Sequence, residues 1–564
     1  MSKGALTLLV SLIILIPIGI YFGAWDYYAI NIPKWDDHPL KGFIDQFVHA
    51  TTFKGKLEAL FKQHNEHRIA LTRFFAWLDY AMFGKLNYRH LMIAGNLLLL
   101  CVIPLWYVLL KNNKKPLFAL VPIPFIWLTL AFEENMYWGM ASIQNFGVVT
   151  LALWTIYLCV HQKPFMFGLS IIAGGLTVAT SGNGLLILPI CAVLLFLSGD
   201  RKRLTIWLLA SLVAIFGYFW TYTKPETNPD SKASLFQLAK GYMAFLGSFA
   251  ESIPVKDHFG ACVFMGIILF LVAISIASTI LFRITKKKYT VKFERVTDLF
   301  CLGAIMLILA TGLIVVYGRA GFGLEGLITS RFKIYSVLLL MVAYLYVVIP
   351  IRGSFLSPYI TGIVFLTVTF NVFSYHYHLV DASNKRKMLT TSQFNWTYTD
   401  KSLKPVADTS FVGNVVEKTP VFYQKWLPLI AIADRQQYAG NSRALTELYS
   451  SITFEKKKNA LLVKNNSYKS QRLQDSGIYI LLSSDKRFYV FPTSRSRNTN
   501  RKELFLKQYY FAPGFHTEIP FSELDKGQYK VAIIRQQGDE TGILFQQDKI
   551  TVETSGQNKV KVNW

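Results

Sequence analysis

The stretch ALTLLVSLIILIPIGIYFGA (residues 5–24) contains no charged side chain. An α-helix of about 20 apolar residues is long enough to cross the hydrocarbon core of a bilayer. Similar runs follow, and the chain is 52% hydrophobic but only 16% charged, whereas a soluble protein carries about 25% charged residues. The first run is also too long for the apolar part of a signal peptide. The sequence therefore predicts a polytopic α-helical membrane protein whose first span is retained.

Eleven transmembrane helices are expected within residues 1–375. The pair on either side of Ser181–Asn183 is short and rich in glycine, which is typical of segments that pack against protein or line a cavity. The expected spans are residues 5–24, 91–110, 116–132, 146–161, 165–180, 183–198, 204–222, 259–282, 298–317, 334–350 and 355–374.

Lysine and arginine gather in the short loops that share one side with the N-terminus. These basic loops are residues 111–116, 161–164, 199–203, 283–295 and 351–354. Because basic loops remain in the cytoplasm, we expect a cytoplasmic N-terminus. The outer loops are then residues 25–90, 131–146, 223–258 and 317–335. The basic loops explain part of the formal net charge of +25. The rest is spread over the C-terminal part without forming a continuous tract, so a nucleic-acid partner is not expected.

Residues 376–564 differ from the rest of the chain in their pattern. A helical stretch comes first, over residues 419–440. Alternating apolar and polar residues, bounded by turn signals, then occupy 477–484, 487–494, 514–524, 527–537 and 542–553. Such alternation is typical of strands that bury one face. We expect an extracytoplasmic α+β domain with a helical start and a small antiparallel β-sandwich.

An acidic pair, Asp36–Asp37, follows the first span directly in NIPKWDDHPLKGF (31–43). Pro33 and Pro39 restrict the backbone on either side of it, and Trp35 suits the membrane interface. Adjacent carboxylates raise the pKa of at least one of them, which suits a general base that works near neutral pH. The simpler interpretation, two solvated acids in an outer loop, remains open from the residues alone.

The first outer loop also contains the stretch QHNEHRIALTRFFAWLDYAMFG (63–84). Its large apolar residues fall mainly on one helical face, away from Glu66 and Arg73. We expect an amphipathic helix in the membrane interface, with its apolar face toward the acyl chains. An ordinary helix between two spans has the same pattern.

Two further outer loops carry side chains that suit a sugar phosphate. Acids and amides hydrogen-bond to hydroxyl groups, and aromatic faces stack on sugar rings; the second loop offers Glu133, Glu134, Trp138 and Gln144. In the fourth loop, Arg319, Arg331 and Lys333 lie close to several glycines, and a guanidinium group suits phosphate oxygens. The alternatives are an aromatic belt with solvated acids and arginines that extend to the membrane surface.

Several kinds of protein are disfavoured by the sequence. No Gly-x-x-x-x-Gly-Lys-Ser/Thr motif occurs, which argues against ATP-driven transport. The expected spans carry almost no ionisable side chains, which argues against an ion-coupled transporter. His49, His64 and His67 lie near one another in sequence but lack a metal-binding spacing, so no metal site is assigned.

The combination of many spans, an acidic pair after the first span, an interfacial helix and an outer C-terminal domain resembles the GT-C superfamily of integral membrane glycosyltransferases. Asp36-Asp37-His38 matches the Asp-Asp-x form of that superfamily's acidic motif. Other segments look like parts of bacterial members: NEHRIALTRFF (65–75), EENMYWGMASIQNF (133–146), VATSGNGLLILP (178–189) and ITSRFKIYSVLLL (328–340). The resemblance covers residues 1–375.

The resemblance implies transfer of a sugar, with inversion, from a polyprenyl-phosphate donor to a cell-envelope glycan or lipid acceptor at the outer face of the bacterial cytoplasmic (inner) membrane. Asp36 or Asp37 would be the general base. The donor phosphate would be bound by Arg319, Arg331 and Lys333, with Arg68 in reserve. Acceptor or sugar contacts would come from His38, Glu66, His67, Glu133, Glu134, Trp138 and Gln144.

No cofactor is required by this chemistry, although some relatives use a divalent metal, for which Asp36, Asp37 and Glu134 are ligands of a suitable type. Membrane lipids are expected partners. Two other functions remain open. One is an outer-face polymerase or ligase that transfers a whole lipid-linked oligosaccharide. The other is a non-catalytic transporter of a lipid carrier.

Overall fold

The computed structural model describes residues 2–223, 233–286, 292–397, 411–417, 422–440, 442–469, 475–507 and 509–553. The chain divides into two compact units. The first consists of Met1–Asp26, Gln46–Met82 and Arg89–His378. The second consists of Tyr27–Asp45, Phe83–Tyr88 and Leu379–Trp564. The acidic pair thus belongs to the same unit as the C-terminal domain, although it precedes most of the first unit in sequence.

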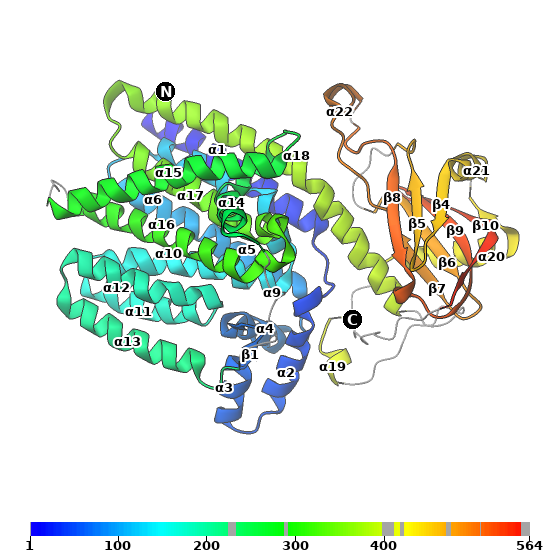
Figure 1. The fold of residues 1–564 in the computed structure, drawn as a ribbon, viewed down its shortest axis with the longest axis horizontal. Coiled ribbons are helices and arrows are strands. Elements are labelled where there is room, and N and C mark those ends of the chain that lie inside the picture. Colours follow the sequence, from blue (N-terminus) through cyan, green and yellow to red (C-terminus); the bar gives the residue numbers. More distant parts are fainter. Residues whose placement is uncertain are drawn as a thin grey trace. The chain divides into compact units, whose positions relative to one another are not determined.

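The first unit is built almost entirely of helices, many of which run alongside one another (Figure 1). The longer ones are α1 (Lys3–Tyr28), α5 (Tyr88–Leu100), α6 (Val102–Asn112), α10 (Gly147–Val160), α11 (Pro164–Val178), α12 (Ile187–Ser198), α13 (Arg201–Phe219), α14 (Leu235–Leu246), α15 (His258–Thr285), α16 (Lys292–Arg319), α17 (Lys333–Val348) and α18 (Leu356–Thr397). Of these, α18 continues into the second unit.

Nine helical segments in the described part of the chain are long and apolar enough to cross a membrane. They are consistent with a membrane protein. Two shorter apolar helices, Pro164–Val178 and Gly182–Ser198, flank the predicted break at Ser181–Asn183. Every expected span therefore overlaps an apolar helix, while the number of spans and their orientation stay predictions.

The third expected outer loop contains a packed helix, α14, that the sequence pattern did not indicate. Gly247, just after α14, lies against α15, where an added Cβ would be 2.0 Å from the Cys262 carbonyl oxygen. In return, a Cβ on Gly266 of α15 would be 1.7 Å from the Met243 carbonyl oxygen of α14. Such distances require glycine at both positions, because only a residue without a side chain lets two helix backbones approach this closely.

The first expected outer loop folds into several short elements. They are η1 (Trp35–Asp37), α2 (Pro39–His49), α3 (Phe53–Phe61), the hairpin β1 (Gln63–His64) and β2 (His67–Arg68), and α4 (Ala70–Phe83). The expected amphipathic helix is α4, which begins at Ala70 rather than near Gln63. It buries Arg73 and Asp79 and exposes Phe74, so its polar face is turned toward the protein.

The second unit contains the expected sheet region. Its elements are α19 (Phe411–Asn414), α20 (Leu427–Gln436), β3 (Tyr438–Ala439), α21 (Ser442–Ser450), β4 (Ile452–Lys456), β5 (Ala460–Asn465), β6 (Gly477–Ser483), β7 (Phe488–Pro492), α22 (Arg501–Lys507), β8 (Phe515–Pro520), β9 (Gly527–Gln537) and β10 (Glu540–Val552). The strands form an antiparallel sheet in the order β3-β10-β9-β6-β7 and a second one in the order β4-β5-β8.

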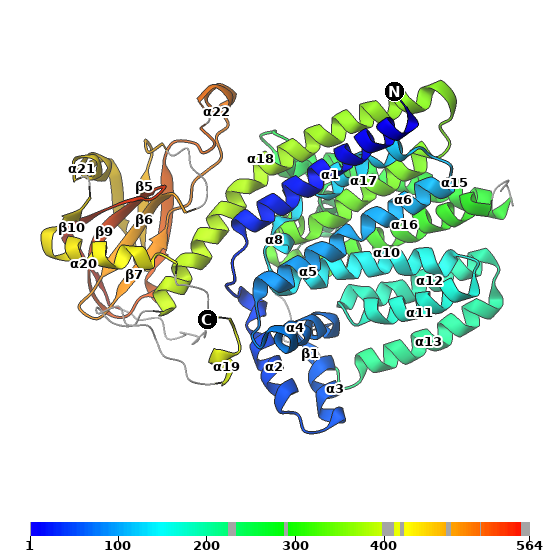
Figure 2. The same cartoon turned by 180° about the vertical axis from the view of Figure 1, so that it is seen from behind.

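The two sheets share one apolar core. Leu461 and Val463 of β5 pack in the same cluster as Ile480 of β6 and Ile533 of β9. On its other face, the larger sheet is covered by α20 and by the end of α18, as Figure 2 shows. This arrangement buries both faces of β6, which is why all seven of its residues are buried although the sequence alternates only weakly there.

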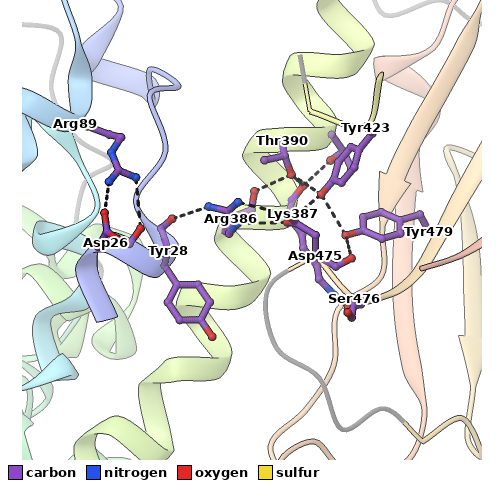
Figure 3. Close-up of polar contacts among 11 residues, drawn as sticks. Asp26, Tyr28, Arg89, Arg386, Lys387, Thr390, Tyr423, Asp475, Ser476 and Tyr479 are labelled. Carbon is purple, nitrogen blue, oxygen red and sulfur yellow. Dashed lines mark hydrogen bonds and ion pairs between the residues drawn. The ribbon is translucent and has the colours of Figure 1, made fainter. Parts of the chain in front are cut away.

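A buried polar network joins the end of α18 to the start of β6 (Figure 3). Arg386 Nε and Nη2 contact the two oxygens of Asp475 at 3.3 and 3.4 Å. Lys387 is fully buried and donates to the Ser476 carbonyl at 2.5 Å. The Tyr423 hydroxyl group contacts both Asp475, at 3.3 Å, and the Tyr479 hydroxyl group, at 3.1 Å. Because its polar groups contact one another, we interpret the network as structural.

Asp475→Ala is expected to destabilise the protein by about 3 kcal/mol, because it leaves the Arg386 guanidinium group mostly buried without its carboxylate. Thermal unfolding of the purified full chain measures this loss. The matched control is Asp485→Ala, in the exposed turn after β6. A double variant, Asp475→Leu with Arg386→Met, should regain much of the stability, since it removes both charges. Equal unfolding temperatures for Asp475→Ala and Asp485→Ala would contradict the prediction.

Candidate functional site

Glu66 and Arg319, from the first and fourth expected outer loops, form an ion pair in the first unit. Glu66 lies in the turn between β1 and β2, and Arg319 is the last residue of α16. Arg319 Nη2 donates to Glu66 Oε1 at 3.0 Å, and about a third of each side chain is exposed. The pair is therefore within reach of a ligand from outside the protein.

His67 completes this cluster. The backbone N–H of Gly182 donates to His67 Nδ1 at 3.1 Å, so the neutral ring carries its proton on Nε2. That nitrogen lies 3.6 Å from Glu66 Oε1. One carboxylate oxygen thus faces both a guanidinium group and an imidazole group. Burial alone would raise the pKa of Glu66. The charge that His67 carries when protonated, a backbone hydrogen bond, and the charges of Arg319 and His64 together outweigh burial and lower the pKa.

The turn Ser181–Asn183 brings residues of three loops together. Ser181 accepts a hydrogen bond from Gln144 Nε2 at 3.3 Å, which ties it to the second loop. Gly182 binds His67 of the first loop. Asn183 Nδ2 donates to the Tyr335 hydroxyl group at 2.5 Å, near the end of the fourth loop. The glycine-rich break between α11 and α12 therefore contacts two predicted site residues, His67 and Gln144, together with Tyr335.

Arg68 and Arg73 are engaged with backbone carbonyl groups. Arg68, 5% exposed, donates to the carbonyl groups of Phe61, Tyr218 and Trp220. These carbonyl groups belong to the ends of α3 and α13, where helices leave acceptors unsatisfied. Arg73 binds Leu60 and Lys62 in the same way, and burial followed by the nearby Arg68 charge lowers its pKa to about 10. Arg68 thus positions the first loop against α13, whereas Arg73 joins α4 to the end of α3 within that loop.

A second cluster joins the second and fourth loops. Arg331 Nε lies 3.5 Å from Glu134 Oε2, and its guanidinium carbon is 5.5 Å from the centre of the Trp138 ring. The Ser330 hydroxyl group accepts from the Glu134 backbone N–H at 3.1 Å. The side chain of Arg331 is 30% exposed, which leaves part of this cation accessible. Trp138, which the sequence predicted as a sugar contact, is only 1% exposed.

The remaining candidates of these two loops are more deeply placed. Lys333 is 3% exposed and forms an ion pair with Glu251, which the sequence had not singled out. Glu133 is also buried. Neither residue presents an accessible charge comparable to those of Arg319 and Arg331.

The acidic motif Asp36-Asp37-His38 belongs to the second unit, and its three residues differ from one another in their exposure to solvent. Asp37 is fully buried, and its Oδ2 accepts from the Lys34 backbone N–H at 3.0 Å. Asp36 is half-buried. Burial, with a smaller contribution from Lys41, lowers the pKa of His38 to about 4, so His38 is neutral at neutral pH. Of the two acids, Asp36 is the one that solvent reaches.

The backbone beside the acidic pair is strained. Trp35 has a φ of +42°, a conformation that bulky side chains rarely adopt. The ring is 60% exposed, so packing of the indole does not explain the strain. Lys34 Nζ lies 4.3 Å from the centre of that ring. Strain of this kind tends to persist where function requires a particular geometry, which adds weight to the segment as part of a site.

Among the residues that the structure describes, no group of three or more His, Cys, Asp or Glu side chains is arranged to hold a metal ion. The sequence pattern pointed to most of the side chains discussed above. It did not point to the roles of Ser181, Gly182, Tyr335 and Glu251. Only the run of small residues at 180–184 marked this turn in advance.

No protein-family model matches the chain, and no curated protein or solved structure matches it either.

Proposed function

We propose that the chain is a membrane glycosyltransferase that moves a sugar from a polyprenyl-phosphate donor to a cell-envelope glycan or lipid acceptor. The observation that carries the proposal is the Ser181–Asn183 turn, which holds His67, Gln144 and Tyr335 from three different loops. Loops that lie on one side of a membrane meet in this way. The expected span count assigns these loops and this turn to the same outer side.

Arg319 is the proposed contact for the donor phosphate. A partly exposed ion pair contributes little stability, whereas a guanidinium group binds phosphate oxygens through two parallel hydrogen bonds. An arriving phosphate therefore displaces the Glu66 carboxylate from Arg319. Arg331, whose side chain is 30% exposed, offers a second cation, and the buried Trp138 ring packs beside its guanidinium group.

The proposed reaction is a direct displacement. Asp36 takes the proton of the acceptor hydroxyl group while that oxygen forms a bond to the anomeric carbon of the sugar. The bond between this carbon and the phosphate oxygen breaks, and the lipid phosphate leaves with the electron pair. Arg319 stabilises the charge that develops on the phosphate. Attack from the face opposite the leaving group inverts the configuration of the anomeric carbon.

The test uses the full chain in lipid nanodiscs with radiolabelled polyprenyl-phosphate sugars and a membrane extract as acceptor. We expect loss of label from the donor lipid and its appearance in a new product, and much slower transfer with Arg319→Gln. A donor that carries a whole oligosaccharide, consumed in preference to single sugars, would favour the polymerase or ligase. Movement of donor across the bilayer without consumption would favour a transporter and overturn the proposal.

Gly182→Ala is expected to lower the transfer rate about tenfold, because positioning errors of about 1 Å are costly in catalysis. An added Cβ would lie 2.8 Å from His67 Nδ1 and 3.2 Å from the Tyr218 hydroxyl oxygen, so the His67 ring must move. The matched control is Gly175→Ala on α11, where an added Cβ meets nothing within 4 Å. Equal transfer rates for the two variants would show that the His67 position does not matter.

A further inference from the structure

The short helix α3 (Phe53–Phe61) exposes its large apolar side chains, whereas a surface helix of a soluble protein buries them. Phe53, Leu57 and Phe61 follow one another at intervals of four residues and are 77%, 39% and 43% exposed. The inward side carries the small residues Gly55, half-buried, and Ala59, buried. A surface helix in water normally turns its large apolar stripe toward the core, so this stripe needs another apolar environment.

Helix α3 is held against the end of α13, one of the nine membrane-length segments described above. Arg68 donates to the carbonyl groups of Phe61 in α3 and of Trp220 just after α13. Both views show α3 next to this end of α13 (Figures 1 and 2). The exposed apolar side chains of α13 continue up to that end and include Leu212, Val213, Phe216 and Phe219, and the exposed Trp220 follows directly.

The charges around the stripe are mainly positive. Lys54, Lys56 and Lys62 are exposed, and Glu58 is the only acid in α3. Lys54 and Glu58 lie 3.9 Å apart and are 86% and 68% exposed, so this pair hardly neutralises the lysine. An apolar stripe flanked by lysines is the pattern of helices that lie in the plane of a membrane surface.

We infer that α3 lies in the membrane–water interface, inserts Phe53, Leu57 and Phe61 among the acyl chains, and binds the phosphate groups of anionic lipids through Lys54, Lys56 and Lys62. The partner is a lipid surface, because the stripe continues the exposed apolar surface of α13. Helix α3 precedes the stretch 63–84 in which the sequence predicted an interfacial helix. The inference does not depend on the proposed transferase activity.

The test measures the depth of a fluorescent probe in the full chain. The native cysteine at 101 is exposed and the other four are buried, so probes are attached in a Cys101→Ser background. The probe sites on the stripe are Phe53→Cys and Leu57→Cys. The control site is Glu58→Cys, which lies on the same helix but outside the stripe. Nanodiscs contain phosphatidylcholine, with or without an equal part of phosphatidylglycerol, and a nitroxide on the acyl chain of one lipid.

We expect acyl-chain nitroxides to quench the probes at positions 53 and 57 several-fold more than the probe at 58. Nitroxide-labelled phosphatidylglycerol should quench more than labelled phosphatidylcholine, and the combined variant Lys54→Gln, Lys56→Gln, Lys62→Gln should remove that difference. Quenching of positions 53 and 57 by aqueous iodide, without quenching from lipid, would overturn the inference. A disulfide between two copies through Phe53→Cys would also overturn it, by assigning the stripe to a second chain.

Discussion

Asp36→Asn is expected to lower the rate of sugar transfer by about 10²–10⁴-fold, the usual contribution of a general base. The amide cannot take the proton of the acceptor hydroxyl group, and its shape is otherwise unchanged. Because Asp36 is only half-buried, we expect the unfolding temperature to stay the same. Rates are measured with the donor assay in nanodiscs, with Asp485→Asn in the exposed turn after β6 as the control.

The neighbouring acid is expected to respond differently. Asp37 accepts the Lys34 backbone N–H in a fully buried position, so Asp37→Ala should cost about 1–2 kcal/mol of stability, as the loss of a capping group does. Asp37→Asn keeps an accepting oxygen and should be milder. If Asp37→Asn abolished transfer in a folded protein while Asp36→Asn did not, the general base would be Asp37 and our assignment would be wrong.

Arg319→Gln is expected to lower the transfer rate by about 10²–10³-fold, as the loss of one group that stabilises transition-state charge does. The matched control is Arg352→Gln, which removes an arginine that is 81% exposed and lies 3.7 Å from Glu294. We expect Arg352→Gln to transfer at the rate of the unchanged protein. A similar loss in both variants would indicate a general effect of net charge rather than a contact with the donor.

Glu66→Gln tests whether the donor phosphate replaces the Glu66 carboxylate as the partner of Arg319. Without the negative charge at position 66, polyprenyl phosphate should bind more tightly to Arg319. In the unchanged protein, binding should strengthen only at acidic pH, because the lowered pKa of Glu66 keeps the group ionised until the pH falls below the ordinary carboxyl range. The Glu66→Gln variant should lack this pH dependence. Weaker binding in Glu66→Gln would show instead that Glu66 positions Arg319.

The sequence predicted the main architecture because the relevant signals are local. Long apolar runs predicted the helices, and α11 and α12 were recognised as a short pair from their length and glycine content. Alternation predicted β6 to β10, whereas β4 and β5 were missed: ALLVKN (460–465) buries five of its six residues and does not alternate.

Residue chemistry alone did not distinguish the arginines of the outer loops. All three of them, Arg68, Arg319 and Arg331, are cations near expected membrane boundaries. Arg68, however, donates its hydrogen bonds to carbonyl groups at the ends of α3 and α13. Arg319 keeps a partly exposed ion pair with Glu66. The difference depends on which carbonyl groups and carboxylates lie nearby after folding, and most of these come from residues more than a hundred positions away.

By itself, the sequence determined that the chain forms long apolar helices followed by a region of β-sheet, because hydropathy and periodicity depend on neighbours along the chain. Only the tertiary structure decided that the Ser181–Asn183 turn gathers His67, Gln144 and Tyr335, and that α3 turns its apolar stripe outward. Those features arise from packing between segments that are distant in the sequence. The backbone N–H of Gly182, for example, orients the His67 ring through a hydrogen bond, and no local sequence pattern encodes that contact.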